Sequence, residues 1–323
     1  MTVDAETLRR GLALTLERTD LPTLGARVEG KVRDSYRRGD GRRDLITTDR
    51  ISAFDRVLGT LPFKGQILNQ LSAHWFDRTR DVAPNHLLEV PDPAVTVAVE
   101  CEPLPVEWVM RGYLTGVTAT SIWTHYARGE RTFCGHPLPD GLAKNEPLPE
   151  PLLTPSTKAA KGGHDESVSR ATVLSRGLVD EATFAECERI AHAVFARGRA
   201  LCAERGLLLV DTKYELGRAP DGRILVIDEI HTPDSSRIWL ADSYEARLRA
   251  GEEPESFDKE YVRRWLASAG FRGEGPVPPI PDEVRVEAAR RYLEACEAIL
   301  GASFSPDLAP PLDRIRRNLG VPS

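Results

Sequence analysis

The sequence of 323 residues has few cysteines and no surplus of positive charge. Its five cysteines are widely spaced and never form a Cys-x-x-Cys pair, which argues against a disulfide framework or a zinc ribbon and favours a reducing compartment. Lysine and arginine number 43 against 49 aspartates and glutamates, a formal net charge of −6. General nucleic-acid and membrane-surface binders carry a basic excess, so we expect neither class of partner.

Long hydrophobic runs are also missing. The N-terminal segment mixes charges among its apolar residues, and no later stretch approaches the ~18 apolar residues of a membrane-spanning helix. We therefore expect a cytoplasmic protein. The sequence contains no Gly-x-Ser-x-Gly, no Walker A motif and no Gly-x-Gly-x-x-Gly after a predicted strand, which argues against the commonest hydrolase, P-loop and dinucleotide-binding proteins.

Apolar periodicity predicts strands early in the chain and helices late. Residues 26–49 alternate with a period near two around a Gly-Asp-Gly turn, which predicts a β-hairpin with Lys31 and Arg33 on one face. Six prolines within 136–155 exclude a helix or a central strand and predict an extended loop. Helical spacing predicts three helices, over 66–80, 181–205 and 283–301. Because strands and helices segregate along the chain, the expected class is α+β.

The clearest chemical signal is a second predicted hairpin, formed by largely apolar residues 207–217 and 223–230 on either side of a Pro-Asp-Gly turn. Its first strand carries three charged residues two apart, which share one face: Asp211, Lys213 and Glu215. Charged groups in such a run are costly to bury unless they are paired or bind an ion. With Asp228 on the second strand they could hold Mg²⁺, or they could form a solvated edge with a Lys–Glu pair across the strands.

Other segments carry groups suited to anions. In Gly30-Lys31-Val32-Arg33 the glycine allows close approach of a phosphate and the two cations could cover it, although a solvated surface hairpin would have the same composition. Residues 154–167 have the hydroxyls, lysines and Gly-Gly pair of a loop that closes over an anion, or of an ordinary turn. Arg111 and Arg237 lie among apolar residues, as phosphate ligands or buried salt-bridge partners do.

Residues 49–55 carry side chains that could bind sugar hydroxyls or an amine, namely Asp49, Ser52 and Asp55. A turn followed by a helix N-cap would account for the same residues.

In their order along the chain, these segments resemble the SAICAR synthetase family of purine biosynthesis. The resemblance continues through residues 243–266 and so covers nearly the whole chain. The segments that carry it are GKVRDSY (30–36), DRISAFD (49–55), PFKGQILNQLSAHWF (62–76), VMRGYLTG (109–116), TPSTKAAKGGHDES (154–167), DTKYELG (211–217) and DEIHTPDSSRIW (228–239).

The resemblance implies an ATP-dependent ligation. The carboxylate of carboxyaminoimidazole ribotide would be joined to the amino group of L-aspartate, with release of ADP and phosphate, and with ATP and Mg²⁺ as cofactors. The implied fold has a β-rich N-terminal lobe with the glycine loop (1–107), an ATP-grasp-like or kinase-like middle lobe with the metal hairpin (108–250) and a helical C-terminal part (251–323).

The resemblance also implies roles for individual residues. Lys31 and Arg33 would cover the ATP phosphates. Lys213, Glu215 and Asp228 would form the catalytic group: Lys213 and Asp228 would bind ATP, and Glu215 and Asp228 would hold Mg²⁺.

The substrates would be bound by a second set of residues. The resemblance places the ribotide 5′-phosphate at Arg111, Ser121 and Arg237, and Ser52 and Asp55 near the ribotide or the aspartate. The loop from Ser156 to Asp165, with Lys158, would close over the substrates.

One segment departs from the family pattern. A Thr-Gly-Ser-x-Trp run is expected after Arg111, but four residues separate Gly116 from Ser121 here, so Thr118 or Thr120 could hold the phosphate instead.

Two other functions fit some of these residues. A small-molecule kinase of the inositol-phosphate type would also have Asp-x-Lys on a strand beside acidic residues, but would need no aspartate. A nucleotide-binding regulator without turnover would not need to keep the metal-binding residues.

Overall fold

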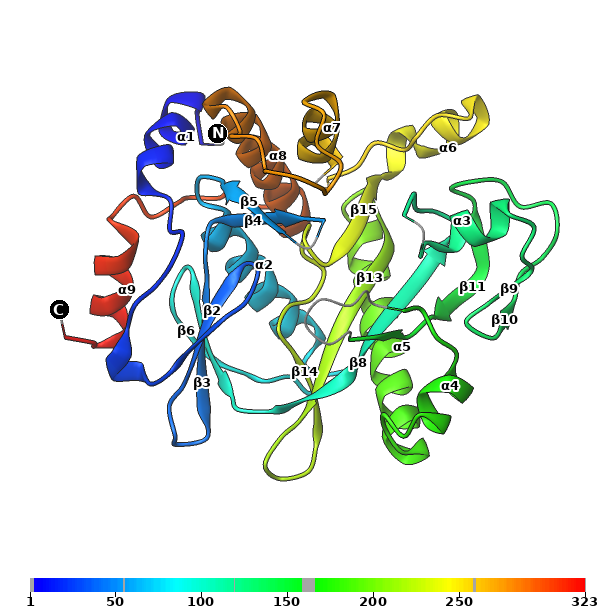
Figure 1. Cartoon of the computed structure of the whole chain (residues 1–323), viewed down its shortest axis with the longest axis horizontal. Helices are drawn as coiled ribbons and strands as arrows, with labels where there is room; N and C mark the ends of the chain where they lie inside the picture. The colour runs from blue at the N-terminus through cyan, green and yellow to red at the C-terminus, as the bar shows by residue number, and fades with distance from the viewer. Residues whose placement is uncertain (1–2, 55, 119, 159–165, 258–259, 323) are drawn as a thin grey trace.

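The computed structural model describes residues 3–54, 56–118, 120–158, 166–257 and 260–322. Two predicted site residues, Asp55 and Asp165, lie outside these ranges. The described residues form two main antiparallel sheets that lie side by side in Figure 1, with helices packed against both. The predicted α+β class is confirmed.

The first sheet has five strands. Their order is β1 (Arg27–Glu29), β2 (Arg33–Arg37), β3 (Arg42–Thr47), β7 (Val95–Val99) and β6 (Leu87–Asp92). The pairing of β2 with β3 confirms the predicted hairpin, since Arg37 is opposite Arg43 across the Gly-Asp-Gly turn. A separate hairpin joins β4 (Arg50–Ala53) to β5 (Arg56–Thr60).

The expected first strand of the hairpin is interrupted. The N–H of Gly30 donates to the carbonyl of Arg33 at 2.8 Å, which closes a turn between β1 and β2. Lys31 therefore lies in a turn, and the prediction that strand alternation places it on one face with Arg33 was wrong. The alternation of apolar and polar residues on either side of Gly30 gave no sign that the chain reverses direction there.

The second sheet is built on two long strands, β8 (Glu102–Tyr113) and β13 (Leu207–Arg218). On the far edge of β13, β14 (Ile224–Ile227) pairs with its last residues and β15 (Ser236–Leu240) with its first. The β13–β14 pairing confirms the predicted buried hairpin, but β14 ends at Ile227, so the prediction that Asp228 lies on the second strand was wrong. At Asp228 the backbone has a positive φ and leaves the strand. The other edge of β8 pairs with β11 (Pro147–Leu153) and β12 (Ser156–Thr157).

The proline-rich segment is more regular than expected. Part of it forms β11, and His136–Pro137 forms β10, which pairs with β9 (Thr132–Phe133). The prediction of an extended loop was therefore wrong for these residues. A strand at the edge of a sheet tolerates prolines because one side needs no N–H donors, and the pairing of β11 shifts register between Pro147 and Leu152.

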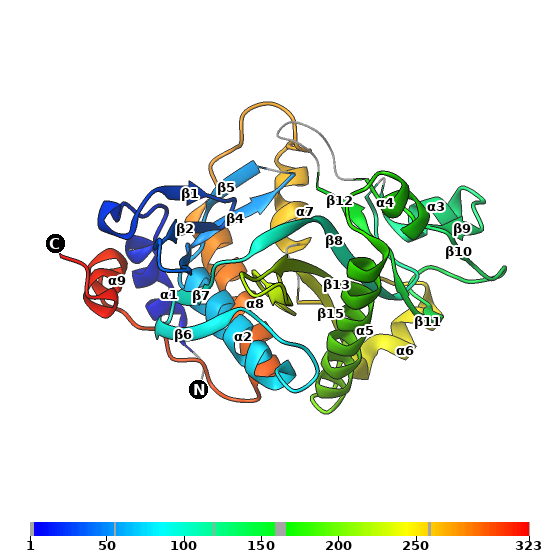
Figure 2. The ribbon, with the colours of Figure 1, turned by 90° about the horizontal axis from the view of Figure 1, so that it is seen from below.

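The predicted helices are confirmed as α2 (Lys64–Thr79), α5 (Glu181–Ala203) and α8 (Asp282–Leu300). Helix α5 packs against β8 and β13, while α2 packs between α5, α8 and the five-stranded sheet (Figure 2). Further helices are α1 (Ala5–Gly11), α3 (Ile122–Ala127), α4 (Arg170–Ser175), α6 (Ala241–Ala250), α7 (Glu260–Ser268), α9 (Pro311–Leu319) and the short 3₁₀ helices η1 (Leu12–Leu14) and η2 (Pro22–Leu24).

The C-terminal helices pack on the N-terminal part of the chain. Helix α8 lies against α1 and α2, and α9 lies against β6, where Arg314 and Asp92 form a buried ion pair at 2.8 Å. The predicted division at 107/108 falls within β8, and the proposed lobe boundaries stay predictions. No helix in the described ranges combines the length and the apolar character that crossing a membrane requires.

Candidate active site

The site lies at the loop that connects β14 to β15 beside β13. Strands β14 and β15 pair with the same edge of β13 in succession, so the segment from Asp228 to Ser235 forms a loop between them. The N–H of Lys213 donates to the carbonyl of Ser235 at 3.0 Å and fixes the loop beside the strand. Asp228 has a φ of 68°, uncommon for a residue with a side chain, where the chain turns out of β14.

A cluster of opposite charges lies on β13 next to this loop. Lys213 Nζ donates to Glu107 Oε1 at 2.7 Å and lies 3.4 Å from Glu215 Oε1. Lys158 Nζ donates to the other oxygen of Glu215 at 2.6 Å. The residues between the charged ones, Thr212 and Tyr214, are buried, so the predicted shared face of β13 is confirmed.

The charges of this cluster stabilise one another. Burial alone would raise the pKa of Glu215, but Lys213 and Lys158 lower it to about 2. Burial alone would lower the pKa of Lys213, but Glu215 and Glu107 raise it above its usual value. Both side chains are therefore charged at neutral pH. Burial, with the nearby charge of Glu215, raises the pKa of Asp228 to about 6 although Arg33 opposes the shift.

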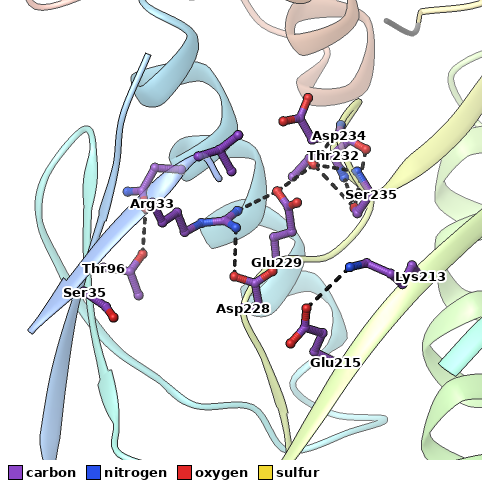
Figure 3. Close-up of polar contacts among 12 residues, drawn as sticks. Arg33, Ser35, Thr96, Lys213, Glu215, Asp228, Glu229, Thr232, Asp234 and Ser235 are labelled. Carbon is purple, nitrogen blue, oxygen red and sulfur yellow. Dashed lines mark hydrogen bonds and ion pairs between the residues drawn. The ribbon is translucent and has the colours of Figure 1, made fainter. Parts of the chain in front are cut away.

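Arg33 links this cluster to the other sheet. It begins β2, and its two terminal nitrogens bind Asp228 Oδ1 at 2.8 Å and Glu229 Oε2 at 2.6 Å (Figure 3). Thr232 Oγ1 also donates to Glu229, at 2.8 Å. The structure thus brings together Arg33, Lys213, Glu215 and Asp228 from the two sheets, as a single site requires.

Two residues of the cluster were not assigned a role from the sequence. Glu229 adjoins Asp228, but nothing local shows that it also binds Arg33. Glu107 lies directly opposite Glu215 on β8. Only the strand register reveals that position, so no sequence signal was available for it.

A second group of charges lies further along β13. Asp211 is opposite Arg111 on β8 and opposite Arg237 on β15. Arg237 Nη1 donates to Asp211 Oδ2 at 3.0 Å, and Arg111 Nε donates to Thr154 Oγ1 at 2.8 Å. Two arginines thus flank one carboxylate, which leaves a local positive charge. Four residues of strand, about 13 Å, separate this pair of arginines from Glu215.

A cavity of about 600 Å³ adjoins Arg237. It is lined by residues 115–118 after β8, by Trp239 of β15 and by Arg263 and Arg264 of α7, among others. This volume is in the range that accommodates nucleotide-sized ligands.

The remaining predicted residues lie elsewhere. Lys31 is exposed in the β1–β2 turn, and Ser52 lies in β4. Ser121 caps α3: its Oγ accepts from the N–H of Thr124 at 3.4 Å and donates to the carbonyl of Thr118 at 2.9 Å. Within the described residues, no hydrogen bond links Ser52 or Ser121 to the Glu215 cluster.

Comparison with known proteins gives a consistent picture. A family model described as SAICAR synthetase matches residues 26–277. A Mesorhizobium japonicum protein named putative phosphoribosylaminoimidazole-succinocarboxamide synthase 2 is 52% identical over 307 residues, covering 94% of this chain and 98% of its own length. The phosphoribosylaminoimidazole-succinocarboxamide synthase of Legionella pneumophila strain Lens is 46% identical over 308 residues, covering 94% and 97%.

A solved structure shares the fold as well. The SAICAR synthase of Saccharomyces cerevisiae, in complex with SAICAR, matches with a TM-score of 0.77 and 30% identity over 90% of this chain and 100% of its own. The predicted fold is confirmed, and the kinase alternative is not favoured. The chain therefore belongs to the SAICAR synthetase family, the ATP-dependent carbon–nitrogen ligases that join L-aspartate to carboxyaminoimidazole ribotide in purine biosynthesis.

Proposed function

We propose that the two charged groups along β13 divide the work of this ligation between phosphoryl transfer and ribotide binding. A carboxylate does not accept an amine at neutral pH, because oxide would have to leave. Transfer of the γ-phosphoryl group to the carboxylate gives an acyl phosphate, from which the amino group of aspartate displaces phosphate. Several negative charges must be brought together for that step, so the site has to supply positive charge.

The Glu215 cluster is the proposed phosphoryl-transfer end. Lys31, Arg33 and Lys213 would bind the ATP phosphates, and Glu215 and Asp228 would hold Mg²⁺. A magnesium ion held by Glu215 and Asp228 would supply positive charge to neutralise the phosphates. Arg33 could donate to the phosphates while it also binds Asp228 and Glu229, because a guanidinium has five N–H donors.

The carboxylates suit this metal. The described residues contain no group of three or more His, Cys, Asp or Glu that could hold an ion by themselves. Mg²⁺ does not need one, because it takes one or two carboxylates and completes its octahedron with phosphate oxygens and water. Glu215 on β13 and Asp228, directly after β14, offer hard oxygen ligands. Each already faces a cation, Lys158 and Arg33 respectively.

The arginine pair is the proposed ribotide end. Arg111 and Arg237 would bind the 5′-phosphate. A ribotide lying along the roughly 13 Å of β13 between these arginines and Glu215 would have its imidazole carboxylate in the Glu215 cluster. Thr118 lines the cavity, whereas the hydroxyl of Ser121 caps α3, so Thr118 is the better candidate for the additional phosphate contact.

The remaining roles are also proposals. Lys158 would cover the substrates from its position on Glu215, and Ser52 would lie near the ribotide or the aspartate. The roles of Asp55 and Asp165 concern residues outside the described ranges and stay predictions. A cytoplasmic location is part of the same proposal.

The convergence of Arg33, Lys213, Glu215 and Asp228 at the junction of the two sheets carries this assignment. The first test is ADP release by the purified protein with Mg-ATP and carboxyaminoimidazole ribotide, with L-aspartate added or omitted. A ligase releases ADP only with both substrates and forms the succinocarboxamide product. Release without aspartate would contradict the proposed coupling and point to a kinase.

A further inference from the structure

One buried arginine holds the turn between β1 and β2. Arg50 of β4 donates from Nη2 to the carbonyl of Gly30 at 2.9 Å and from Nε to the carbonyl of Lys31 at 3.0 Å. The next carbonyl, of Val32, accepts from the N–H and the hydroxyl of Thr48, at 2.9 and 2.8 Å. All three carbonyl oxygens of the turn are therefore fixed by two neighbouring residues.

Arg50 is held in one orientation itself. Its side chain is 3% exposed, and Nη2 also donates to Asp34 Oδ1 at 3.0 Å. Nη1 donates to the carbonyl of Glu17 at 2.5 Å. Asp34 is fully buried and accepts in addition from the N–H of Thr19 at 2.7 Å. A planar guanidinium with this many acceptors has one favourable position, so it imposes a single shape on the turn.

The shape has an electrostatic consequence. A trans peptide unit points its N–H and its C=O in opposite directions. Because the carbonyls of Gly30 and Lys31 face Arg50 in the interior, the N–H groups of Lys31 and Val32 point away from it. Carbonyl oxygens repel phosphate and N–H groups attract it, so the side of the turn opposite Arg50 is suited to an anion. Lys31 itself is exposed.

We propose that Arg50 is a positioning residue for ATP, which acts by fixing the Gly30–Val32 turn so that Lys31 meets the phosphates. The inference rests on the proposed role of Lys31. It assigns to Arg50 an effect on nucleotide binding without contact to the nucleotide.

A double-mutant cycle tests the inference. Arg50→Lys keeps the charge, but a single ammonium cannot reach the acceptors that the guanidinium spans. We expect this variant to raise the KM for MgATP about tenfold and that for the ribotide less than about twofold. In a Lys31→Ala background the same change should alter the KM for MgATP by less than about twofold, because the positioned side chain is gone.

Each other result overturns the inference. An equal effect of Arg50→Lys in both backgrounds would mean that the arginine is merely structural. An effect of Lys31→Ala without one of Arg50→Lys would reject the inference alone. No effect of Lys31→Ala on the KM for MgATP would reject the role of Lys31 as well.

Two further variants guard against a folding defect. Thr48→Val removes the hydroxyl contact to Val32 and the 3.5 Å contact that Thr48 Oγ1 accepts from the N–H of Arg50. We expect a smaller rise in the KM for MgATP, so no rise would count against the inference. Arg38→Lys is the matched control. Arg38 donates to Asp44 from two nitrogens at 2.6 and 2.7 Å, and among the described residues its side chain has no hydrogen bond to the turn. We expect it to leave both KM values unchanged, and a rise like that of Arg50→Lys would overturn the inference.

Discussion

At the scale of single residues, the site pairs each acidic side chain with a cation. Glu215 has Lys158 and Lys213, and Asp228 has Arg33. A buried charge that loses its partner is strongly disfavoured, so these pairs favour the ionised form of the carboxylates. The roles proposed for individual residues can therefore be tested by removing single charges.

The first residue-scale prediction concerns the catalytic group. Lys213→Ala or Asp228→Asn should abolish turnover, because the phosphates lose a cation or the metal loses a ligand. The measurement is ADP release under saturating substrates, with circular dichroism to confirm folding. Turnover like that of the unmodified protein in either folded variant would rule out the assigned role.

The second concerns the arginine pair. Arg237→Ala should raise the KM for the ribotide by about tenfold or more, because a charge-assisted contact to the 5′-phosphate is lost, while the KM for MgATP changes little. Steady-state kinetics with each substrate varied in turn measures both constants. A change in the KM for MgATP alone would place Arg237 at the wrong end of β13.

At the scale of elements, the site depends on β13 and on the helix that supports it. Helix α5 packs on β13 and β8 from the side of their buried residues, with Phe184 against Trp108 at 5.1 Å between ring centres. The start of this helix is fixed by Asp180, whose carboxylate accepts from the N–H of Thr183 at 2.7 Å. The Asp180 cap has no proposed part in substrate binding or catalysis. Its loss should therefore affect stability alone.

The element-scale prediction uses this cap. Asp180→Ala should lower the free energy of unfolding by about 1 kcal/mol, because an N–H of the first turn loses its acceptor. Urea denaturation measures the change, and both KM values should remain those of the unmodified protein. Asp180→Asn is the matched control, since an asparagine caps nearly as well and should recover most of the stability.

At the scale of the whole molecule, buried histidines make the fold sensitive to acid. Burial, with the charges of Arg33 and Arg43, lowers the pKa of His86 to about 3, and burial lowers that of His231 to about 3. Each folded pKa lies below the unfolded value near 6.5, so the unfolded chain binds more protons between pH 6.5 and 3. The stability that these two histidines contribute is therefore complete above pH 6.5 and falls as the pH drops through this range.

The loss of histidine-dependent stability at acidic pH can be tested on the whole molecule. Between pH 7.5 and 5.0 each buried histidine should cost about 2 kcal/mol of stability. His86→Gln does not titrate, so its Tm should fall less over this interval than that of the unmodified protein. Thermal denaturation at the two pH values measures the difference, and identical Tm losses would show that His86 is not buried in its neutral form.

Local pattern and motif order determined much of this protein from the sequence alone. The shared face of Lys213 and Glu215 follows from the two-residue period of a strand, and helices α2, α5 and α8 follow from the helical spacing of apolar residues. The order of the motifs along the chain indicates the family without any geometry. These features depend on neighbours in the chain, which is why they could be read from it.

The tertiary structure decided which distant residues meet. Arg33 and Asp228 are 195 residues apart, and only the packing of the two sheets joins them. Glu107 reaches Lys213 through the register of β8 on β13, and Arg50 reaches the Gly30 turn from a separate hairpin. Strand register and sheet packing are set by the free energy of the whole chain and not by any one segment. A local sequence pattern can therefore reveal which residues belong to the site, but not which residues they contact.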